Sequence, residues 1–220
     1  MHADSLDLFE PIAPIVDKVL LAPGAWWLRG FALSSEDALL QALDCVVNAA
    51  PYRHLITPGG YRMSVAMTNC GPLGWVSDRR GYRYQSNDPQ SARPWPSMPP
   101  VFKQLAQSAA QAAGFAAFAP DACLINCYQI GARLSLHQDR DEYGFDAPIV
   151  SVSLGLPAVF LFGGDARSDK QRRLSLVHGD VVVWGGRARM RYHGVQPIKP
   201  GHHPQLGEQR INLTFRQAAQ

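Results

Sequence analysis

Alternating polar and apolar residues dominate the second half of the chain. The run 210–216 is the clearest example, because polar residues there alternate with Ile211, Leu213 and Phe215, which is the period of a β-strand. Similar short runs recur from residue 123 onward. We expect strands at 123–128, 133–138, 148–155, 158–162, 172–177, 180–184, 189–196 and 210–217. Many short strands separated by turns predict a double-sheet jelly roll, also called a double-stranded β-helix.

Two helices are expected before these strands. The first follows Ser34-Ser35-Glu36-Asp37, which can cap a helix, and ends before Pro51. Its apolar positions share one helix face: Leu39, Leu43, Val46, Val47 and Ala50. The second helix spans about 99–113 and ends at Gly114, with an inward face of Phe102, Leu105, Ala109 and Ala112. Both patterns indicate scaffold helices that support the strands.

The segment 51–98 lies between the two helices and differs from them in composition. It is rich in Gly, Pro, Tyr and Trp, and it shows short possible hairpins but no long periodic element. A segment of this kind inside a compact chain is more often a functional lid than a passive connection.

A single domain is expected over 1–220, because 220 residues, 46% of them hydrophobic, can bury one substantial core. The expected fold class is mainly β with flanking helices (α+β). Within it we expect an N-terminal segment and helix (1–50), the lid (51–98), and a helix with the jelly-roll core (99–220).

Charge and cysteine content say little about the reaction, but they bear on the binding partners and the cellular compartment of the protein. The formal net charge of +3 permits nucleic-acid binding without requiring it. Cys123 and Cys127 are too far apart on an expected strand for a disulfide, and the four cysteines lack zinc-site spacing. The N-terminal run Met1-His2-Ala3-Asp4 does not lead into a basic and then apolar signal, and no stretch approaches a membrane span. We expect reduced thiols in a soluble, unexported, cytoplasmic protein that makes no membrane contact.

The motif His137-Gln138-Asp139 is the strongest candidate for chemistry. On a strand, His137 and Asp139 point to the same side as Arg133 and Ser135. An isolated copy of His-x-Asp is more often a hydrogen-bonded surface pair than a metal site. Together with a second histidine, however, it forms the set of two imidazoles and one carboxylate that holds non-haem Fe(II) and leaves positions for substrate and O₂.

The second histidine is to be chosen among the remaining six of the chain. His193 is favoured because it follows Arg189 and Arg191 on one face of an expected strand. His178 is its rival, but it lies in the turn 178–180, where an imidazole usually faces water. Structural roles are expected for the other four: His2, His54, His202 and His203.

Arg210 and Arg216 lie on one face of the last expected strand. Such a face ordinarily meets solvent, and a polar interior of the jelly roll is the competing explanation; the alternation alone does not separate the two. A guanidinium group binds a carboxylate through two hydrogen bonds, so either arginine could hold an acid that completes the iron shell. The strand rise separates them by roughly 20 Å, so both reach one small dicarboxylate only if the strand bends or the side chains converge.

The combination of His-x-Asp, a distant His and Arg-x-Asn-x-x-x-Arg resembles the signature of the AlkB family of Fe(II)- and 2-oxoglutarate-dependent dioxygenases, most closely its bacterial members. The resemblance runs from about residue 50 to the C-terminus, and it does not extend to 1–24, to the loop 165–171 or to His202-His203. Further segments that carry it are Pro58-Gly59-Gly60-Tyr61, Met63-Ser64-Val65-Ala66-Met67-Thr68-Asn69-Cys70-Gly71, Gly74-Trp75, Pro94-Trp95-Pro96, Pro120-Asp121-Ala122-Cys123-Leu124-Ile125-Asn126 and His178-Gly179-Asp180-Val181-Val182-Val183-Trp184-Gly185-Gly186.

This resemblance implies a cofactor site. His137, Asp139 and His193 would be the iron ligands and the catalytic centre. Arg210 would bind the far carboxylate of 2-oxoglutarate, and Arg216 would lie near the carboxylate on iron. The other implied co-substrate contacts are Asn126, Tyr128 and Asn212. The implied reaction uses O₂ and 2-oxoglutarate, releases succinate and CO₂, and removes an N-methyl group as formaldehyde; the metal supplies the difficult chemistry and the protein the geometry.

The resemblance also implies that the lid recognises a nucleotide. The implied substrate contacts are Met67, Trp75, Tyr82, Arg83, Tyr84, Asp141 and Arg167. A methylated adenine or cytosine carries positive charge, which favours an aromatic face and a nearby carboxylate, and Asp141 can supply the carboxylate. Without the resemblance, we would interpret Trp75 and Tyr82 as packing the lid on the barrel.

A methyl group on a Watson–Crick edge is blocked inside a duplex, so the base must be unpaired or flipped out. We therefore expect a monomer that acts on alkylated single-stranded DNA, with double-stranded DNA and RNA as further substrates. Two alternatives stay open. A 2-oxoglutarate oxygenase of a protein or small molecule would share the iron site and differ at the lid. A non-catalytic jelly-roll binding module would keep the metal as a structural element and form no succinate.

Overall fold

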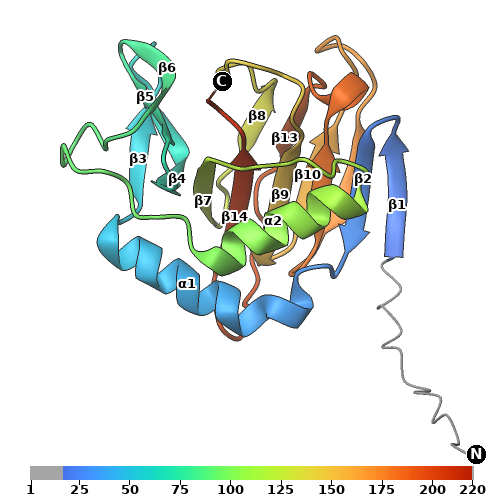
Figure 1. The fold of residues 1–220 in the computed structure, drawn as a ribbon, viewed down its shortest axis with the longest axis horizontal. Coiled ribbons are helices and arrows are strands. Elements are labelled where there is room, and N and C mark those ends of the chain that lie inside the picture. Colours follow the sequence, from blue (N-terminus) through green and yellow to red (C-terminus); the bar gives the residue numbers. More distant parts are fainter. Residues whose placement is uncertain (1–16, 220) are drawn as a thin grey trace, which may run out of the picture.

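The computed structural model of the protein describes residues 17–219, and strands make up much of it (Figure 1). The strands are β1 (Asp17–Ala22), β2 (Ala25–Arg29), β3 (Arg53–Ile56), β4 (Arg62–Cys70), β5 (Gly74–Asp78), β6 (Gly81–Gln85), β7 (Ala122–Gln129), β8 (Leu134–His137), β9 (Ile149–Gly155), β10 (Ala158–Phe162), β11 (Arg172–Leu176), β12 (Val181–Trp184), β13 (His193–Val195) and β14 (Gln209–Arg216). The helices are α1 (Glu36–Ala49) and α2 (Pro100–Ala112), and 3₁₀ turns span Leu33–Ser35 and Gly186–Ala188. The expectations for the run Met1-His2-Ala3-Asp4 lie outside the described residues.

Two antiparallel sheets form the body of the fold. The larger sheet has the order β1-β2-β12-β9-β14-β7-β4-β3, the smaller sheet has the order β11-β10-β13-β8, and β5 pairs with β6 alone. Apolar side chains of both sheets, such as Phe160 and Trp184, pack in one cluster between them. Sheet packing of this kind is that of a jelly roll, so the expected fold class, mainly β with flanking helices, is confirmed.

The two helices cover the outer face of the larger sheet (Figure 1). Leu39 of α1 and Phe102 of α2 are fully buried, and the ring of Phe102 meets that of Phe215 edge-on at 6.0 Å. Helix α1 begins where Ser34-Ser35-Glu36-Asp37 predicts, but Ser35 makes no side-chain capping bond. The 3₁₀ turn that precedes the helix supplies a backbone hydrogen bond instead, since the N–H of Glu36 donates to the carbonyl oxygen of Leu33.

Burial decides how the alternation in β14 is to be interpreted. Ile211, Leu213 and Phe215 face the helices within their apolar cluster. Arg210 and Arg216 are only 1% and 7% exposed, so the opposite face of β14 lines a polar interior between the sheets. The solvent-facing alternative is therefore wrong.

One expected strand is much shorter than its sequence pattern suggests. The prediction for 189–196 is wrong at its start, since only His193–Val195 is a strand. The N–H of Arg189 bonds to the carbonyl of Gly186 and that of Arg191 to Ala188, and such i to i−3 bonds wind the chain into turns. Arg189 and Arg191 thus do not share a strand face with His193.

The segments before residue 100 contain strands that the sequence pattern did not predict. The hairpin β1–β2 extends the larger sheet beyond β12. In the expected lid, β4 is a nine-residue strand paired with β7, so the expectation of no long regular element there is wrong. The C-terminal half of β4 is buried on both faces, which removes the alternation that reveals a half-exposed strand. Within the described segment 51–98, the strands β5 and β6 pair with each other outside the larger sheet (Figure 1).

Two further findings concern sequence expectations. All four cysteines are free in the structure. Neither helix of the described residues is long and apolar enough to cross a membrane.

Candidate active site

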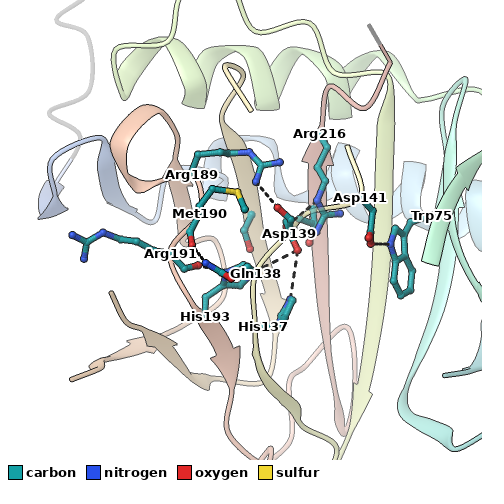
Figure 2. A network of polar contacts seen from close by, with 12 residues as sticks. Trp75, His137, Gln138, Asp139, Asp141, Arg189, Met190, Arg191, His193 and Arg216 are labelled. Carbon is teal, nitrogen blue, oxygen red and sulfur yellow. Dashed lines mark hydrogen bonds and ion pairs between the residues drawn. The ribbon is translucent and has the colours of Figure 1, made fainter. Parts of the chain in front are cut away.

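Three side chains expected to bind a metal converge between the two sheets (Figure 2). His137 ends β8 and His193 begins β13, and the two are register partners. Their Nε2 atoms lie 3.6 and 3.8 Å from Oδ1 of Asp139. All three ligand atoms lie within 4.8 Å of one another, a separation that one metal ion can bridge.

A glycine allows the two histidine strands to approach. A Cβ atom at Gly194 would lie only 2.8 Å from the carbonyl oxygen of Leu134, closer than side chains tolerate. The pairing of β13 with β8 is irregular between His193 and Val195, as is common beside active sites. Gly194 therefore lets β13 lie against β8 closely enough to bring the imidazoles together.

The hydrogen bonds of both imidazoles leave their Nε2 atoms free to bind a metal. Nδ1 of His137 lies 2.9 Å from the carbonyl oxygen of Ser135, and Nδ1 of His193 lies 3.0 Å from that of Arg191. Because a carbonyl only accepts, Nδ1 carries the proton in both rings. Burial, and then the neighbouring His137, lower the pKa of His193 to about 3, so this ring is neutral near pH 7.

Asp139 is held as a carboxylate. Burial alone would raise the pKa of its carboxyl group, but Arg216, followed by His193 and His137, holds that pKa well below its usual range. Nε and Nη2 of Arg216 donate to Oδ2 at 3.0 and 2.6 Å. Oδ2 is thus engaged by the guanidinium group, while Oδ1 faces the two imidazoles.

Two buried residues complete this network, and sequence reasoning missed both. Glu142 lies 3.2 Å from Arg216, accepts a hydrogen bond from Arg189 at 2.9 Å, and accepts another from the hydroxyl of Tyr84 at 2.8 Å. Arg189 also donates to the backbone carbonyl of Asp139 at 3.0 Å. The network therefore fixes both the side chain and the backbone of Asp139.

Sequence pattern offered little signal for these two residues. Glu142 follows Asp139 and Asp141 out of step with their alternation, and its only signal was a third carboxylate close to the metal motif. Arg189 was expected on a strand face, whereas the turn after the 3₁₀ segment directs it inward, where it is 2% exposed.

An aromatic wall stands beside the metal cluster. Nε1 of Trp75 donates to Oδ2 of Asp141 at 2.7 Å (Figure 2), and the ring of Tyr82 stacks on Trp75 at 5.4 Å and 15°. Met67 is buried on β4 as the register partner of Asn126. The hairpin β5–β6 and the segment after β8 thus place an aromatic surface and a carboxylate together.

Comparisons with known proteins agree with this geometry. The 2OG-Fe(II) oxygenase superfamily matches residues 24–216. The alpha-ketoglutarate-dependent dioxygenase AlkB of Salmonella typhimurium is 58% identical over 215 residues, which cover 98% of this chain and 99% of that protein. The chain belongs to the AlkB family of Fe(II)- and 2-oxoglutarate-dependent dioxygenases.

Two further AlkB-type relatives are more distant. The structure of OsALKBH1 has a TM-score of 0.79 and 31% identity, and the match covers 91% of this chain and 99% of that one. The nucleic acid dioxygenase ALKBH1 of Mus musculus is 32% identical over 133 residues, 60% of this chain and 33% of that protein.

The polar interior fits the co-substrate of the AlkB family. Nε and Nη1 of Arg210 are buried and have no hydrogen-bond partner among the described residues, and the same holds for Oδ1 of Asn126. Arg210 makes one bond, from Nη2 to Oγ of Ser153 at 3.0 Å, and its guanidinium lies 5.1 Å from the ring centroid of Tyr128. An unpaired buried cation is costly, so this pocket suits a carboxylate ligand such as that of 2-oxoglutarate.

Two expected substrate contacts are engaged by other residues, and the two arginines of β14 do not converge on one group. Arg83 is engaged within its own hairpin, where it donates to both carboxylate oxygens of Asp78 at 3.0 and 2.8 Å. Arg167 lies over the ring of Tyr192 at 5.5 Å. Arg210 and Arg216 bind different groups at opposite ends of β14.

Three further histidines of the described residues, His54, His178 and His203, make contacts outside the metal cluster, and the expectation for one of them is corrected. Nδ1 of His54 is hydrogen bonded to the carbonyl oxygen of Met63. His178 was expected to face water, but its side chain is only 13% exposed. Its ring stacks on His203 at 4.4 Å, since the chain between β13 and β14 packs over the turn that carries His178.

Proposed function

We propose that the protein oxidatively demethylates N-alkylated bases, such as 1-methyladenine and 3-methylcytosine, in single-stranded DNA. Double-stranded DNA and RNA are proposed as further substrates. The observation that carries this proposal is the aromatic wall of Trp75 and Tyr82, with Asp141, directly beside the metal cluster. A flat cationic base suits an aromatic face next to a carboxylate. Membership of the AlkB family and a relative named as a nucleic acid dioxygenase support a nucleic-acid substrate.

The roles of the inner residues follow from their contacts. His137, Asp139 and His193 would hold Fe(II), and Arg210, with Tyr128 beside it, would hold the far carboxylate of 2-oxoglutarate. Asn126, Asn212 and Arg216 would complete the co-substrate contacts. Iron with 2-oxoglutarate and O₂ supplies the oxidation of a C–H bond. Arg216 and Arg189 keep the Asp139 segment in place, the first through its carboxylate and the second through its carbonyl.

The outer residues would hold and orient the base. The face of Trp75 would stack on it, with Met67 and Tyr84 on neighbouring elements. Burial raises the pKa of Asp141, the Trp75 hydrogen bond opposes this, and Glu142 and Asp139 add to the rise. A cationic base beside Asp141 would restore the charged carboxylate. Arg167 and Arg83 are proposed phosphate contacts, and Arg83 would have to leave Asp78 for that role.

Single-stranded substrates are favoured because a methyl group on the Watson–Crick edge prevents pairing and lowers the cost of exposing the base. A monomer suffices for this activity, because the metal cluster, the cofactor pocket and the aromatic wall all belong to one chain. A cytoplasmic protein with reduced thiols agrees with the four free cysteines.

The direct test is anaerobic loading of the protein with Fe(II) and 2-oxoglutarate, followed by O₂ and an oligonucleotide that carries one 3-methylcytosine. Mass spectrometry should show loss of the methyl group, with formaldehyde and succinate released together. Succinate formation with an unchanged oligonucleotide would favour a protein or small-molecule oxygenase. No succinate with any substrate would favour the non-catalytic binding module.

A pair of tryptophans separates base stacking from packing. Trp75→Ala should weaken oligonucleotide binding by about 1–3 kcal/mol, the scale of one base on one ring, and leave the melting temperature unchanged. Trp95 is the matched control, since it is 6% exposed beneath the hairpin and bonded to the carbonyl of Gln85. Trp95→Ala should cost about 3–5 kcal/mol of stability. A large decrease in the melting temperature of Trp75→Ala would show that this ring also packs against the protein core.

A further inference from the structure

Two exposed aromatic residues follow the active-site carboxylates along the chain. Tyr143 is 75% exposed and Phe145 is 41% exposed. They come directly after Asp141 and Glu142, the carboxylates that contact Trp75 and Arg216. Single exposed apolar residues are ordinary on protein surfaces, but two of them within three positions at the edge of a binding site form a surface on which a ligand can lie.

The site itself fixes the segment 140–145 in position. Asp141 is tied to Trp75 at 2.7 Å, and Glu142 is buried against Arg189. The N–H of Tyr143 lies 3.4 Å from the carbonyl oxygen of Ala218. The side chains of Asp141 and Glu142 are therefore anchored, while the ring of Tyr143 is left in solvent.

Phe145 is tied to the same arginine that holds Glu142. The guanidinium of Arg189 lies 5.3 Å from the centroid of the Phe145 ring, within the range of a cation–π contact. Arg189 thus couples the buried network to the exposed segment, and Phe145 supports the segment from which Tyr143 projects. A ring carried on a restrained segment loses less conformational entropy when it binds than one on a free loop.

The chemistry of this surface fits a nucleic-acid strand. An aromatic ring stacks on any base without regard to its identity. Arg140 is exposed three positions before Tyr143, and its positive charge attracts phosphates. A strand whose damaged nucleotide lies at Trp75 continues past the site through its neighbouring nucleotides, and the segment 140–145 borders that site.

We propose that Tyr143 is a stacking platform for a base that flanks the reacting nucleotide in single-stranded nucleic acid. This inference rests on the proposed function and adds a second contact point for the strand. It predicts that affinity depends on the length of the substrate, since a methylated mononucleotide has no flanking base to stack.

The test compares substrates of two lengths. Tyr143→Ala should bind a methylated pentanucleotide about 5- to 150-fold more weakly, the range that stacking of one base on one ring provides. Its turnover of the methylated mononucleotide should equal that of the wild type. Tyr143→Phe keeps the ring and should bind like the wild type, whereas Tyr143→Leu, which is apolar without a ring, should behave like Tyr143→Ala.

Fluorescence can locate the contact directly. With 2-aminopurine placed next to the methylated base, on its 5′ side in one oligonucleotide and its 3′ side in another, stacking should quench the signal at one position. The quenching should persist in Tyr143→Phe and disappear in Tyr143→Ala. Leu20→Ala is a control for general loss of an exposed apolar side chain, because Leu20 is 51% exposed on β1, at the opposite edge of the larger sheet from β3, and the quenching seen with this variant should match that of the wild type.

The outcomes that overturn this inference differ from those that overturn the proposed function. Wild-type protein that demethylates oligonucleotides, together with a Tyr143→Ala variant of unchanged affinity and quenching, rules out the platform alone. Failure of the wild type to demethylate a methylated base at any length rules out the proposed function. A wild-type dimer that becomes monomeric in Tyr143→Ala, as seen by analytical ultracentrifugation, would assign Tyr143 to contact between copies and also overturn the platform.

Discussion

The described residues contain two clusters of two histidines and one carboxylate. One is His137, Asp139 and His193, and the other is Glu36, His178 and His203. In each cluster the candidate ligand atoms lie within 4.8 Å of one another. Residue types and distances therefore do not distinguish them, and the difference lies in the hydrogen bonds made by the rings.

Backbone partners set the protonation of the rings in opposite ways. In the first cluster, carbonyl oxygens of Ser135 and Arg191 accept from Nδ1, so Nε2 keeps its lone pair. In the second cluster, the backbone N–H of Gly155 donates to Nδ1 of His178 at 2.9 Å. The proton of neutral His178 must then be on Nε2, which lies 3.2 Å from Oε1 of Glu36. A protonated nitrogen offers no lone pair to a metal.

Ring orientation separates the clusters as well. The imidazoles of His137 and His193 are tilted by 55°, which allows their in-plane lone pairs to converge beside Asp139. The imidazoles of His178 and His203 are stacked at 17° with their centroids 4.4 Å apart, so their in-plane lone pairs lie in two separate, nearly parallel planes. The comparison shows that a metal site depends on how the backbone orients and protonates its ligands.

The largest expected effect distinguishes the two clusters by substitution. His193→Ala should lose Fe(II) and lower turnover by more than about 100-fold, because even a change behind a ligand costs 10- to 100-fold. His178→Ala should keep both iron and turnover. Anaerobic iron binding and succinate formation, measured side by side, check this. Iron loss in His178→Ala with an active His193→Ala would reverse the assignment.

A titration with Co(II) under anaerobic conditions sharpens the same comparison. Convergent imidazoles should give one tight site per chain, with visible bands of Co(II) that disappear in Asp139→Ala. Glu36→Gln and His203→Ala should leave the stoichiometry at one. A second equivalent bound at similar affinity, and removed by His203→Ala, would show that His178 gives up its Nε2 proton and that the hydrogen-bond argument is wrong.

The sequence predicts those parts of this molecule that repeat a local pattern. The strict alternation of β14 and the His-x-Asp spacing of β8 are visible along the chain, and the structure places His137, Asp139 and His193 together as expected. The roles of Asn126, Tyr128 and Arg210 came from the family resemblance rather than from the pattern. Tyr128 in particular has the sequence context of any buried strand residue.

The parts that could not be predicted depend on contacts between distant segments. Strand β4 is buried on both faces by packing, so its sequence lacks the alternation that marks a half-exposed strand. Arg189 and Glu142 are 47 positions apart and become partners only when the turn after Gly186–Ala188 directs the arginine inward. His178 is buried by His203, which belongs to a different loop. Such contacts have no signature in one sequence.

The smallest expected effect concerns the protonation of the second cluster. Burial, and then His203, lower the pKa of His178 below the usual value of 6.5 for a histidine, and Glu36 opposes this shift. Below pH 6.5 the unfolded chain therefore binds more protons at this residue than the folded one. Stability is unaffected by His178 above that pH and falls as the pH drops toward the folded pKa.

The melting temperatures of the wild type and of His178→Asn, measured with the same iron loading, should therefore diverge as the pH is lowered from about 7.5 to about 5.5. These two values bracket the pKa of histidine in an unfolded chain, which is about 6.5. Asn offers Oδ1 to the Gly155 N–H in place of Nδ1 but has no proton to gain. On acidification, the melting temperature of the wild type should fall further than that of the variant. The extra fall should be at most about 2–4 °C, the shift that a change of 1 kcal/mol in stability causes in a domain of this size. Every other titrating group is common to both proteins, so the difference reports His178 together with its contacts to Glu36 and His203. Equal acid slopes would mean that the pKa of His178 is the same in the folded and unfolded chain, and the contrast between the two clusters would then rest on ring orientation alone.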